Sequence, residues 1–194
     1  MTAVVDTDFR SSRMSSEERM VIFASSLGTV FEWYDFYIYG TLGAFLAKYF
    51  FSNVPANIGF IFALLAFAAG FAVRPFGALI FGRLGDMIGR KYTFLVTMSL
   101  MGIGTFFIGV LPGYDTWGIL APVVLIALRL VQGLALGGEY GGAAIYVAEH
   151  APRDKRGFYT SWIQTTATLG LLMALLLILA IRTVMGEEAF GEWG

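Results

Sequence analysis

Five long apolar segments decide what the chain can fold into. They cover approximately residues 20–47, 56–81, 92–111, 117–147 and 158–184. A helix needs about 20 mostly apolar residues to cross the hydrocarbon core of a membrane, and each segment reaches that length. None shows the period-2 alternation of a half-buried strand. The sequence therefore predicts an all-α integral membrane protein, with five transmembrane helices forming a bundle over residues 20–194.

The composition supports this prediction and excludes several kinds of site. Only 14% of the residues are charged, against roughly 25% in soluble domains. The chain has no cysteine, which excludes disulfides, thiolate nucleophiles and cysteine metal ligands. It has 24 glycines, which suit close helix packing in lipid. The first apolar segment is not a cleaved signal peptide, because it is too long and carboxylates interrupt it.

The placement of basic residues predicts the orientation in the membrane. Loops rich in lysine and arginine stay in the cytoplasm, and here they alternate with loops that are poor in both. The basic segments are the tail 1–19, the loop 82–91 and the loop 149–157. We therefore expect an inner-membrane, multi-pass protein with a cytoplasmic N-terminal tail over residues 1–19. The end "GEWG" then lies outside after an odd number of helices, and it suggests an interrupted, longer sequence.

The stretch "FEWYDFYIYG" places Glu32 and Asp35 in the middle of the first predicted helix. A carboxylate near the centre of a bilayer costs roughly 2.5–3.5 kcal/mol on insertion scales. Arg129 falls near the middle of the fourth predicted helix, so it can meet Asp35 if the two helices adjoin. Such a pair can gain or lose a proton when it is separated. The alternative is a structural ion pair that only fixes helix register.

Further polar and aromatic residues predict a cavity beside these acids. Aromatic rings can line a cavity and bind a cationic solute, although Tyr39 also suits an interfacial belt. Arginines favour a carboxylate, whereas the acids and rings favour a quaternary amine, and both alternatives stay open. The predicted cavity residues are Tyr34, Tyr37, Tyr39, Arg74, Gln132 and Glu139.

No pattern in the chain indicates an enzyme. The single histidine, His150, lies in a predicted loop, and one histidine does not make a metal site. The metalloprotease, α/β-hydrolase and phosphate-loop motifs are absent. We expect no enzymatic activity, no cofactor, no metal and no nucleic-acid partner; the predicted partners are the lipid bilayer, a small solute and a proton.

Several motifs resemble those of a known transporter group. "GRLGDMIGRK" (82–91) closely resembles the loop between the second and third helices of the major facilitator superfamily. "RLVQGLALGGE" (129–139) resembles that superfamily's fourth-helix motif. Together with "FEWYDFYIYG" and "EHAPRDKRG", they resemble the metabolite:proton symporter family, whose members carry proline and betaine, 2-oxoglutarate, shikimate, citrate and similar organic acids. The resemblance covers nearly the whole chain.

The resemblance implies a fold of twelve helices in two halves, of which this chain would be the N-terminal portion, with the C-terminal half missing. It also implies proton-coupled symport of a small organic acid or zwitterion by alternating access. Asp35 would be the protonatable group and Arg129 its partner, with Glu32 the next candidate. The residues of the cytoplasmic gate would be Gly82, Gly85, Asp86, Gly89, Arg90, Glu149, Arg153 and Arg156.

Two alternatives remain at this stage. The superfamily's drug antiporters carry a Gly–Pro pair in the fifth helix, and residues 158–184 contain no proline; this absence favours symport. The other alternative is a truncated or stand-alone five-helix membrane protein without transport activity. Energy for symport would come from the proton gradient.

Overall fold

The computed structural model describes residues 16–137, 144–145, 147–149 and 151–193. In these ranges the chain forms helices joined by short turns, and they contain no strand. The helices are α1 (Ser16–Thr41), α2 (Gly43–Phe50), α3 (Ala56–Ala72), α4 (Arg74–Ile88), α5 (Arg90–Gly109), α6 (Tyr114–Trp117), α7 (Leu120–Gly137), η1 (Arg153–Lys155), α9 (Arg156–Met185) and α10 (Glu187–Trp193). The all-α prediction is confirmed.

The distribution of polar and apolar side chains is the reverse of that in a soluble protein. Large apolar residues such as Leu79, Phe106 and Val184 lie on the outside, whereas Asp35 and Arg129 are buried. Four helical stretches in the described part are long and apolar enough to cross a membrane: Ala56–Ile88, Tyr92–Gly109, Leu120–Gly137 and Arg153–Met185. α1 is not among them, since its acids and tyrosines make it less apolar, so the fifth span stays a prediction.

A single proline divides the second predicted segment into two helices. Pro75 has no backbone N–H, so the carbonyl of Phe71 loses the partner that a continuous helix would give it. α3 therefore ends at Ala72, and α4 begins at Arg74 with the proline in its first turn, a position that proline favours. The segment 56–81, predicted as one helix, is thus α3 followed by α4. The break places Arg74 near the middle of the span.

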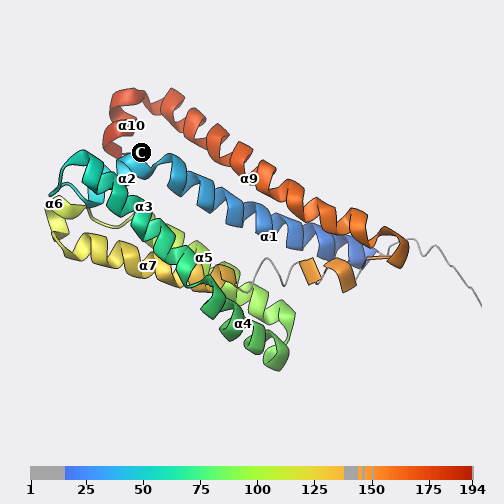
Figure 1. Ribbon diagram of the computed structural model, residues 1–194. Helices are drawn as coiled ribbons and strands as arrows, with labels where there is room; N and C mark the ends of the chain where they lie inside the picture. Colours follow the sequence, from blue (N-terminus) through green and yellow to red (C-terminus); the bar gives the residue numbers. More distant parts are fainter. Residues whose placement is uncertain (1–15, 138–143, 146, 150, 194) are drawn as a thin grey trace, which may run out of the picture.

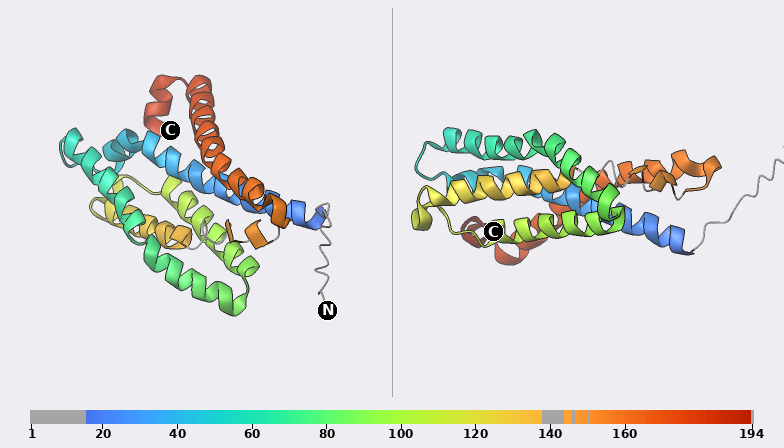
Figure 2. Two further views of the ribbon diagram at one scale, coloured as in Figure 1. Left: turned by 45° about the vertical axis from the view of Figure 1, so that its right-hand side comes forward. Right: turned by 90° about the horizontal axis from the view of Figure 1, so that it is seen from below.

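The helices form two groups, which Figures 1 and 2 show from three directions. In the first group, α1 and α9 run side by side and in the same direction along most of their lengths. In the second group, α7 packs against α3, α4 and α5. The polar centre of α1 faces this second group, and that is where the predicted site residues lie.

Glycines bring α7 into backbone contact with α3 and α4. A Cβ atom added at Gly133 would overlap the carbonyl of Gly70, and one added at Gly137 would overlap the carbonyl of Arg74. On the other side, a Cβ at Gly77 would overlap the carbonyl of Leu134. Such close approach is possible only without a side chain. These contacts fit the close helix packing that the many glycines predict, and they fix the backbone around Arg74.

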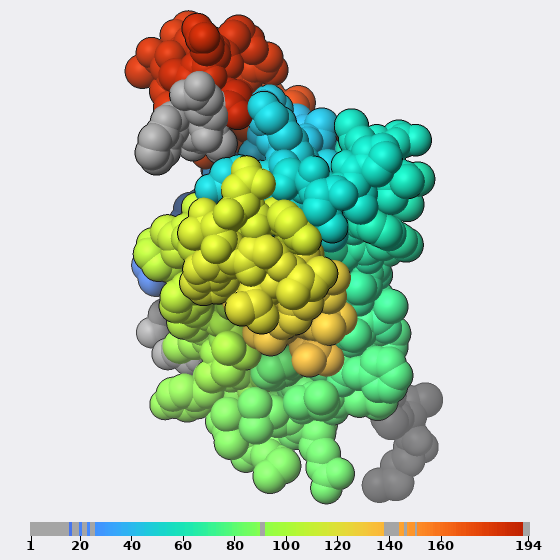
Figure 3. All heavy atoms as spheres, turned by 90° about the vertical axis from the view of Figure 1, so that its left-hand side faces the viewer, coloured from blue at the N-terminus to red at the C-terminus, as the bar shows by residue number. Residues whose placement is uncertain are grey.

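The last helix, α10, folds back over one end of the bundle. Gly186 makes the turn with a φ of 82°, and Arg182 pairs with Glu187 across it. Phe190 is buried against Phe45 with their ring centroids 5.3 Å apart. Figure 3 views the molecule from this end and shows the red C-terminal residues beside the cyan residues of α2. α10 therefore ties the end of α9 to α2.

Candidate functional site

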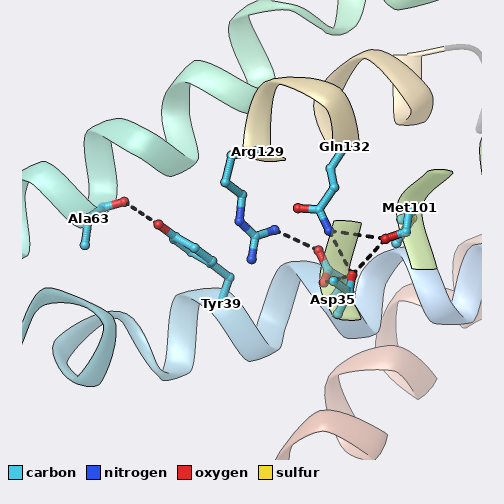
Figure 4. Close-up of polar contacts among 7 residues, drawn as sticks. Asp35, Tyr39, Ala63, Met101, Arg129 and Gln132 are labelled. Atoms are coloured by element: carbon cyan, nitrogen blue, oxygen red, sulfur yellow. Dashed lines mark hydrogen bonds and ion pairs between the residues drawn. The ribbon is translucent and has the colours of Figure 1, made fainter. Parts of the chain in front are cut away.

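A buried ion pair joins the two helix groups. Arg129 Nη1 on α7 donates to Asp35 Oδ2 on α1 over 2.9 Å. Asp35 is 5% exposed and Arg129 is 7% exposed. Figure 4 shows the two side chains pointing toward one another across the space between the helices. The sequence had placed these residues at one depth, and the structure brings them into contact.

Thr105 on α5 completes the environment of the Asp35 carboxylate. Its hydroxyl donates to Asp35 Oδ1 over 2.8 Å, and it also lies 3.0 Å from the carbonyl oxygen of Met101. A threonine hydroxyl holds one proton but can accept two hydrogen bonds. It can therefore donate to a charged Asp35, or accept from a protonated Asp35 while donating to Met101. Sequence reasoning missed Thr105, because nothing distinguishes it from other threonines on the same helix.

Gln132 on α7 extends the hydrogen-bond network toward α5. Its Nε2 atom donates to Thr105 Oγ1 over 2.8 Å and lies 3.4 Å from the carbonyl oxygen of Met101. The side chain is almost fully buried, and within the described ranges its Oε1 atom has no hydrogen-bond partner. Gln132, a predicted cavity residue, is thus packed against α5 and supports Thr105.

Tyr39 is part of the buried centre. Its ring lies 3.8 Å from the Arg129 guanidinium carbon and stacks on Phe67 at a centroid distance of 5.1 Å. Its hydroxyl donates to the carbonyl of Ala63 over 3.0 Å, and the residue is 1% exposed. The interfacial-belt alternative for Tyr39 is therefore wrong, because a belt residue keeps its hydroxyl in the headgroup region.

A second ion pair lies one turn away on α1. Arg74 Nη1 at the start of α4 is 3.9 Å from Glu32 Oε1, a distance too long for a hydrogen bond. Glu32 is buried, and its Oε2 atom has no hydrogen-bond partner among the described residues. The Arg74 guanidinium stacks on the ring of Phe71 at 4.0 Å. This pair is looser than that of Asp35 and Arg129.

The two remaining predicted cavity tyrosines, Tyr34 and Tyr37, are half-buried on α1. Tyr37 stacks on Trp33 at a centroid distance of 6.0 Å and meets the edge of Phe36 at 5.2 Å. Phe36 in turn contacts Phe67 and Phe71 on α3. The aromatic residues therefore form a continuous wall between α1 and α3, beside both ion pairs. Glu139 lies outside the described residues.

The predicted gate residues lie at the opposite end from α10. Gly89 forms a tight turn, since it is the single residue between α4 and α5, with a φ of 96°. The other two predicted gate glycines, Gly82 and Gly85, lie inside α4. Arg90 begins α5. Four further predicted gate residues are exposed: Asp86, Glu149, Arg153 and Arg156. Within the described part, Asp86 makes no ion pair with Arg153 or Arg156.

One further hollow, of about 380 Å³, lies between α3 and α7. Phe62, Leu65 and Val123 are among its lining residues, and the lining is mostly apolar. No predicted site residue contributes to it, so it is a poor candidate for binding a polar solute. Across the described residues, no group of three or more histidine, aspartate or glutamate side chains is arranged to hold a metal ion.

Comparison with known proteins places the chain among transporters. The profile of the sugar (and other) transporter family matches residues 20–193. The chain is 43% identical over 176 residues to the proline/betaine transporter of Salmonella typhimurium, covering 91% of this chain and 35% of the relative. It is 41% identical over 180 residues to the shikimate transporter of Escherichia coli, covering 92% of this chain and 41% of that relative.

A third relative is the alpha-ketoglutarate permease of Escherichia coli, 38% identical over 193 residues, with 100% of this chain and 44% of the relative covered. The chain thus spans less than half the length of these curated relatives. No solved structure matches it. These relatives are named as transporters or permeases, so the expectation that the chain is not an enzyme is confirmed. The chain belongs to the sugar (and other) transporter family of the major facilitator superfamily.

Proposed function

We propose that the chain belongs to a proton-coupled symporter of a small organic acid or zwitterion that works by alternating access. A second half, equivalent to the remaining length of the relatives, would close the cavity over the aromatic wall of α1 and α3. Proline, betaine, shikimate and alpha-ketoglutarate, which the relatives' names give, all carry a carboxylate. Identities of about 40% over most of the chain support a solute of that class.

The observation that carries the proton coupling is the buried carboxylate of Asp35. Arg129 donates a hydrogen bond to it, while the Thr105 hydroxyl can serve either protonation state. When a conformational change draws Arg129 away, an unpaired carboxylate in an apolar surround takes up a proton. Re-forming the pair releases that proton on the other side. Each charge moved down the membrane potential supplies about 2.3 kcal/mol per 100 mV.

Alternating access requires that one helix bundle rocks against the other around a site near the midplane. We place the gate at the end that carries Asp86, Gly89 and Arg153, and we propose that this end is cytoplasmic. The exposure of Asp86 and Arg153 leaves both side chains available to contacts that form in another conformation. The basic content of this end supports the orientation.

The test is the variant Asp35→Asn, made in the protein as its gene encodes it and reconstituted in proteoliposomes. Uptake of labelled proline, betaine, shikimate and alpha-ketoglutarate is measured under an imposed pH gradient. Asp35→Asn should abolish accumulation of the solute that the parent protein concentrates. Exchange of internal for external solute should continue, because exchange needs no net proton movement.

Asp115→Asn is the matched control, since Asp115 is an exposed aspartate that accepts a hydrogen bond from Ser52. It should accumulate solute like the parent. If Asp35→Asn also accumulates solute as well as the parent, the carboxylate is structural and Asp35 is not the coupling residue. Failure of the parent protein to move any of the four solutes would favour a membrane protein without this transport activity.

A further inference from the structure

The two membrane-embedded arginines differ in how fully their charges are used. Arg129 is 7% exposed, makes a hydrogen-bonded ion pair and packs on Tyr39. The Arg74 side chain is 27% exposed, and its one ion pair within the described part is 3.9 Å long. A guanidinium has five N–H donors, and in the described part the Nε atoms of both Arg74 and Arg129 lack a hydrogen-bond partner. The two arginines therefore differ in their exposure and in their terminal nitrogens: Arg129 Nη1 donates to Asp35, whereas the ion pair of Arg74 is too long for a hydrogen bond.

Glu32 shows the same lack of partners from the acidic side. Its side chain is 5% exposed, yet Oε2 has no hydrogen-bond partner in the part of the chain that the structure describes. Charged groups in an apolar surround are normally paired at hydrogen-bonding distance, because their desolvation is otherwise uncompensated. A pair that stays long and only half-satisfied is poorly optimised as a structural element. It is better suited to a site in which one charge exchanges its partner.

The backbone at Arg74 is held firmly although its side chain is not. The carbonyl of Arg74 touches α7 at Gly137, and Gly77 one turn later touches the backbone at Leu134. The interruption between α3 and α4 lies at Val73, directly before Arg74. In membrane proteins, interrupted helices at this depth occur where the backbone is buried in protein or lines a water-filled cavity. The Arg74 guanidinium thus extends from a stretch of backbone that is held in place by its contacts with α7.

The surface beside Arg74 suits a small organic solute. Phe71, on which the guanidinium stacks, is 37% exposed, and it continues the aromatic wall through Phe36 to Trp33 and Tyr37. Such a wall supplies apolar contact next to a cation with free donors. Guanidinium groups bind carboxylates in a planar, two-pronged geometry that adds specificity as well as energy.

We propose that Arg74 binds the carboxylate of the transported solute, and that Glu32 is the internal counter-charge that holds Arg74 when no solute is present. This inference rests on the proposed transport function and names the residue that recognises the solute. An arriving carboxylate takes the terminal nitrogens of Arg74 from the exposed side. It does so against the negative charge of Glu32, which competes for the same guanidinium.

The test measures equilibrium binding to the full protein, as its gene encodes it, in lipid nanodiscs. The probes are betaine, shikimate, alpha-ketoglutarate and choline, which carries the quaternary ammonium of betaine but no carboxylate. We expect at least one of the three carboxylates to bind. If betaine binds, choline should bind at least tenfold more weakly than betaine. Arg74→Gln should weaken carboxylate binding at least tenfold, with a smaller loss in Arg74→Lys.

Glu32→Gln gives the decisive result, because it should tighten carboxylate binding several-fold, an effect that misfolding cannot produce. Arg182→Gln is the matched control: Arg182 also pairs with a glutamate, Glu187, and lies over an aromatic ring, Phe190, but at the far end of α9. It should bind like the parent. Three results would overturn the inference: weaker carboxylate binding in Glu32→Gln, unchanged binding in a folded Arg74→Gln, or no binding of any carboxylate probe.

The binding test is separate from proton coupling. Equilibrium binding is measured without a pH gradient and needs no net proton movement, so its outcome does not depend on the role of Asp35. If coupling at Asp35 fails while the Arg74 results hold, only the coupling proposal is lost. If coupling holds while Arg74→Gln binds normally, only the assignment of Arg74 is lost.

Discussion

The contact between Asp35 and Arg129 makes a quantitative prediction about stability. At 2.9 Å and an effective dielectric constant of about 20, the attraction is on the order of 6 kcal/mol, before desolvation is subtracted. Removing one member of a buried pair leaves the other charge uncompensated, which costs about 3–5 kcal/mol. An ordinary hydrogen bond between membrane helices contributes only about 0.6 kcal/mol. Asp35→Asn and Arg129→Gln should therefore each destabilise the protein by several kcal/mol.

The double variant should lose much less than the sum of the two single losses, because no unpaired charge remains. The assay is reversible unfolding in mixed micelles of detergent and dodecyl sulfate, followed by the fluorescence of the four tryptophans. Asp115→Asn, at an exposed site, should change the free energy of unfolding by less than about 0.5 kcal/mol. Single losses below about 1 kcal/mol that add in the double variant would refute the claim that this is an energetically coupled pair.

Two further outcomes follow from other parts of the molecule. Gly133→Ala should lower the free energy of unfolding by about 1–3 kcal/mol, because the added Cβ would overlap the carbonyl of Gly70. Gly102 faces open space, so Gly102→Ala should not destabilise the protein. Equal losses for the two variants in the same unfolding assay would contradict the close helix contact. Arg153→Cys, in a chain without other cysteines, should react with a membrane-impermeant maleimide only in inverted vesicles, and labelling of right-side-out vesicles would reverse the proposed orientation.

The long-range features of the fold were predictable because they depend on patterns that extend over many residues. Apolar length located the helices, and charges inside apolar segments located the site. The break between α3 and α4 has a local signal, Pro75, but the 56–81 segment was read as one helix because its hydrophobicity continues across the proline. Of the loop glycines, the sequence could not show which one carries the turn, since only the backbone conformation at Gly89 reveals it.

Site residues were predictable only where a charge made them conspicuous. Asp35 and Arg129 stand out in an apolar context, and each must find a partner. Thr105 does not stand out, because threonine is common in membrane helices and its own backbone can satisfy its hydroxyl. Tyr39 was ambiguous for a related reason: a tyrosine suits both a membrane interface and a buried site. Only the positions of Arg129 and Ala63 around it decide between the two.

The backbone contacts between α7 and the α3–α4 segment bear on how solute specificity can diverge in this family. At positions 77, 133 and 137 a backbone carbonyl of the neighbouring helix occupies the space that a side chain would need, so any substitution there disturbs the helix packing whatever the solute. The aromatic wall between α1 and α3 is held instead by contacts between side chains. If the wall contacts the solute as proposed, a lineage can replace its rings one at a time while the scaffold that carries Arg74 and Arg129 stays the same.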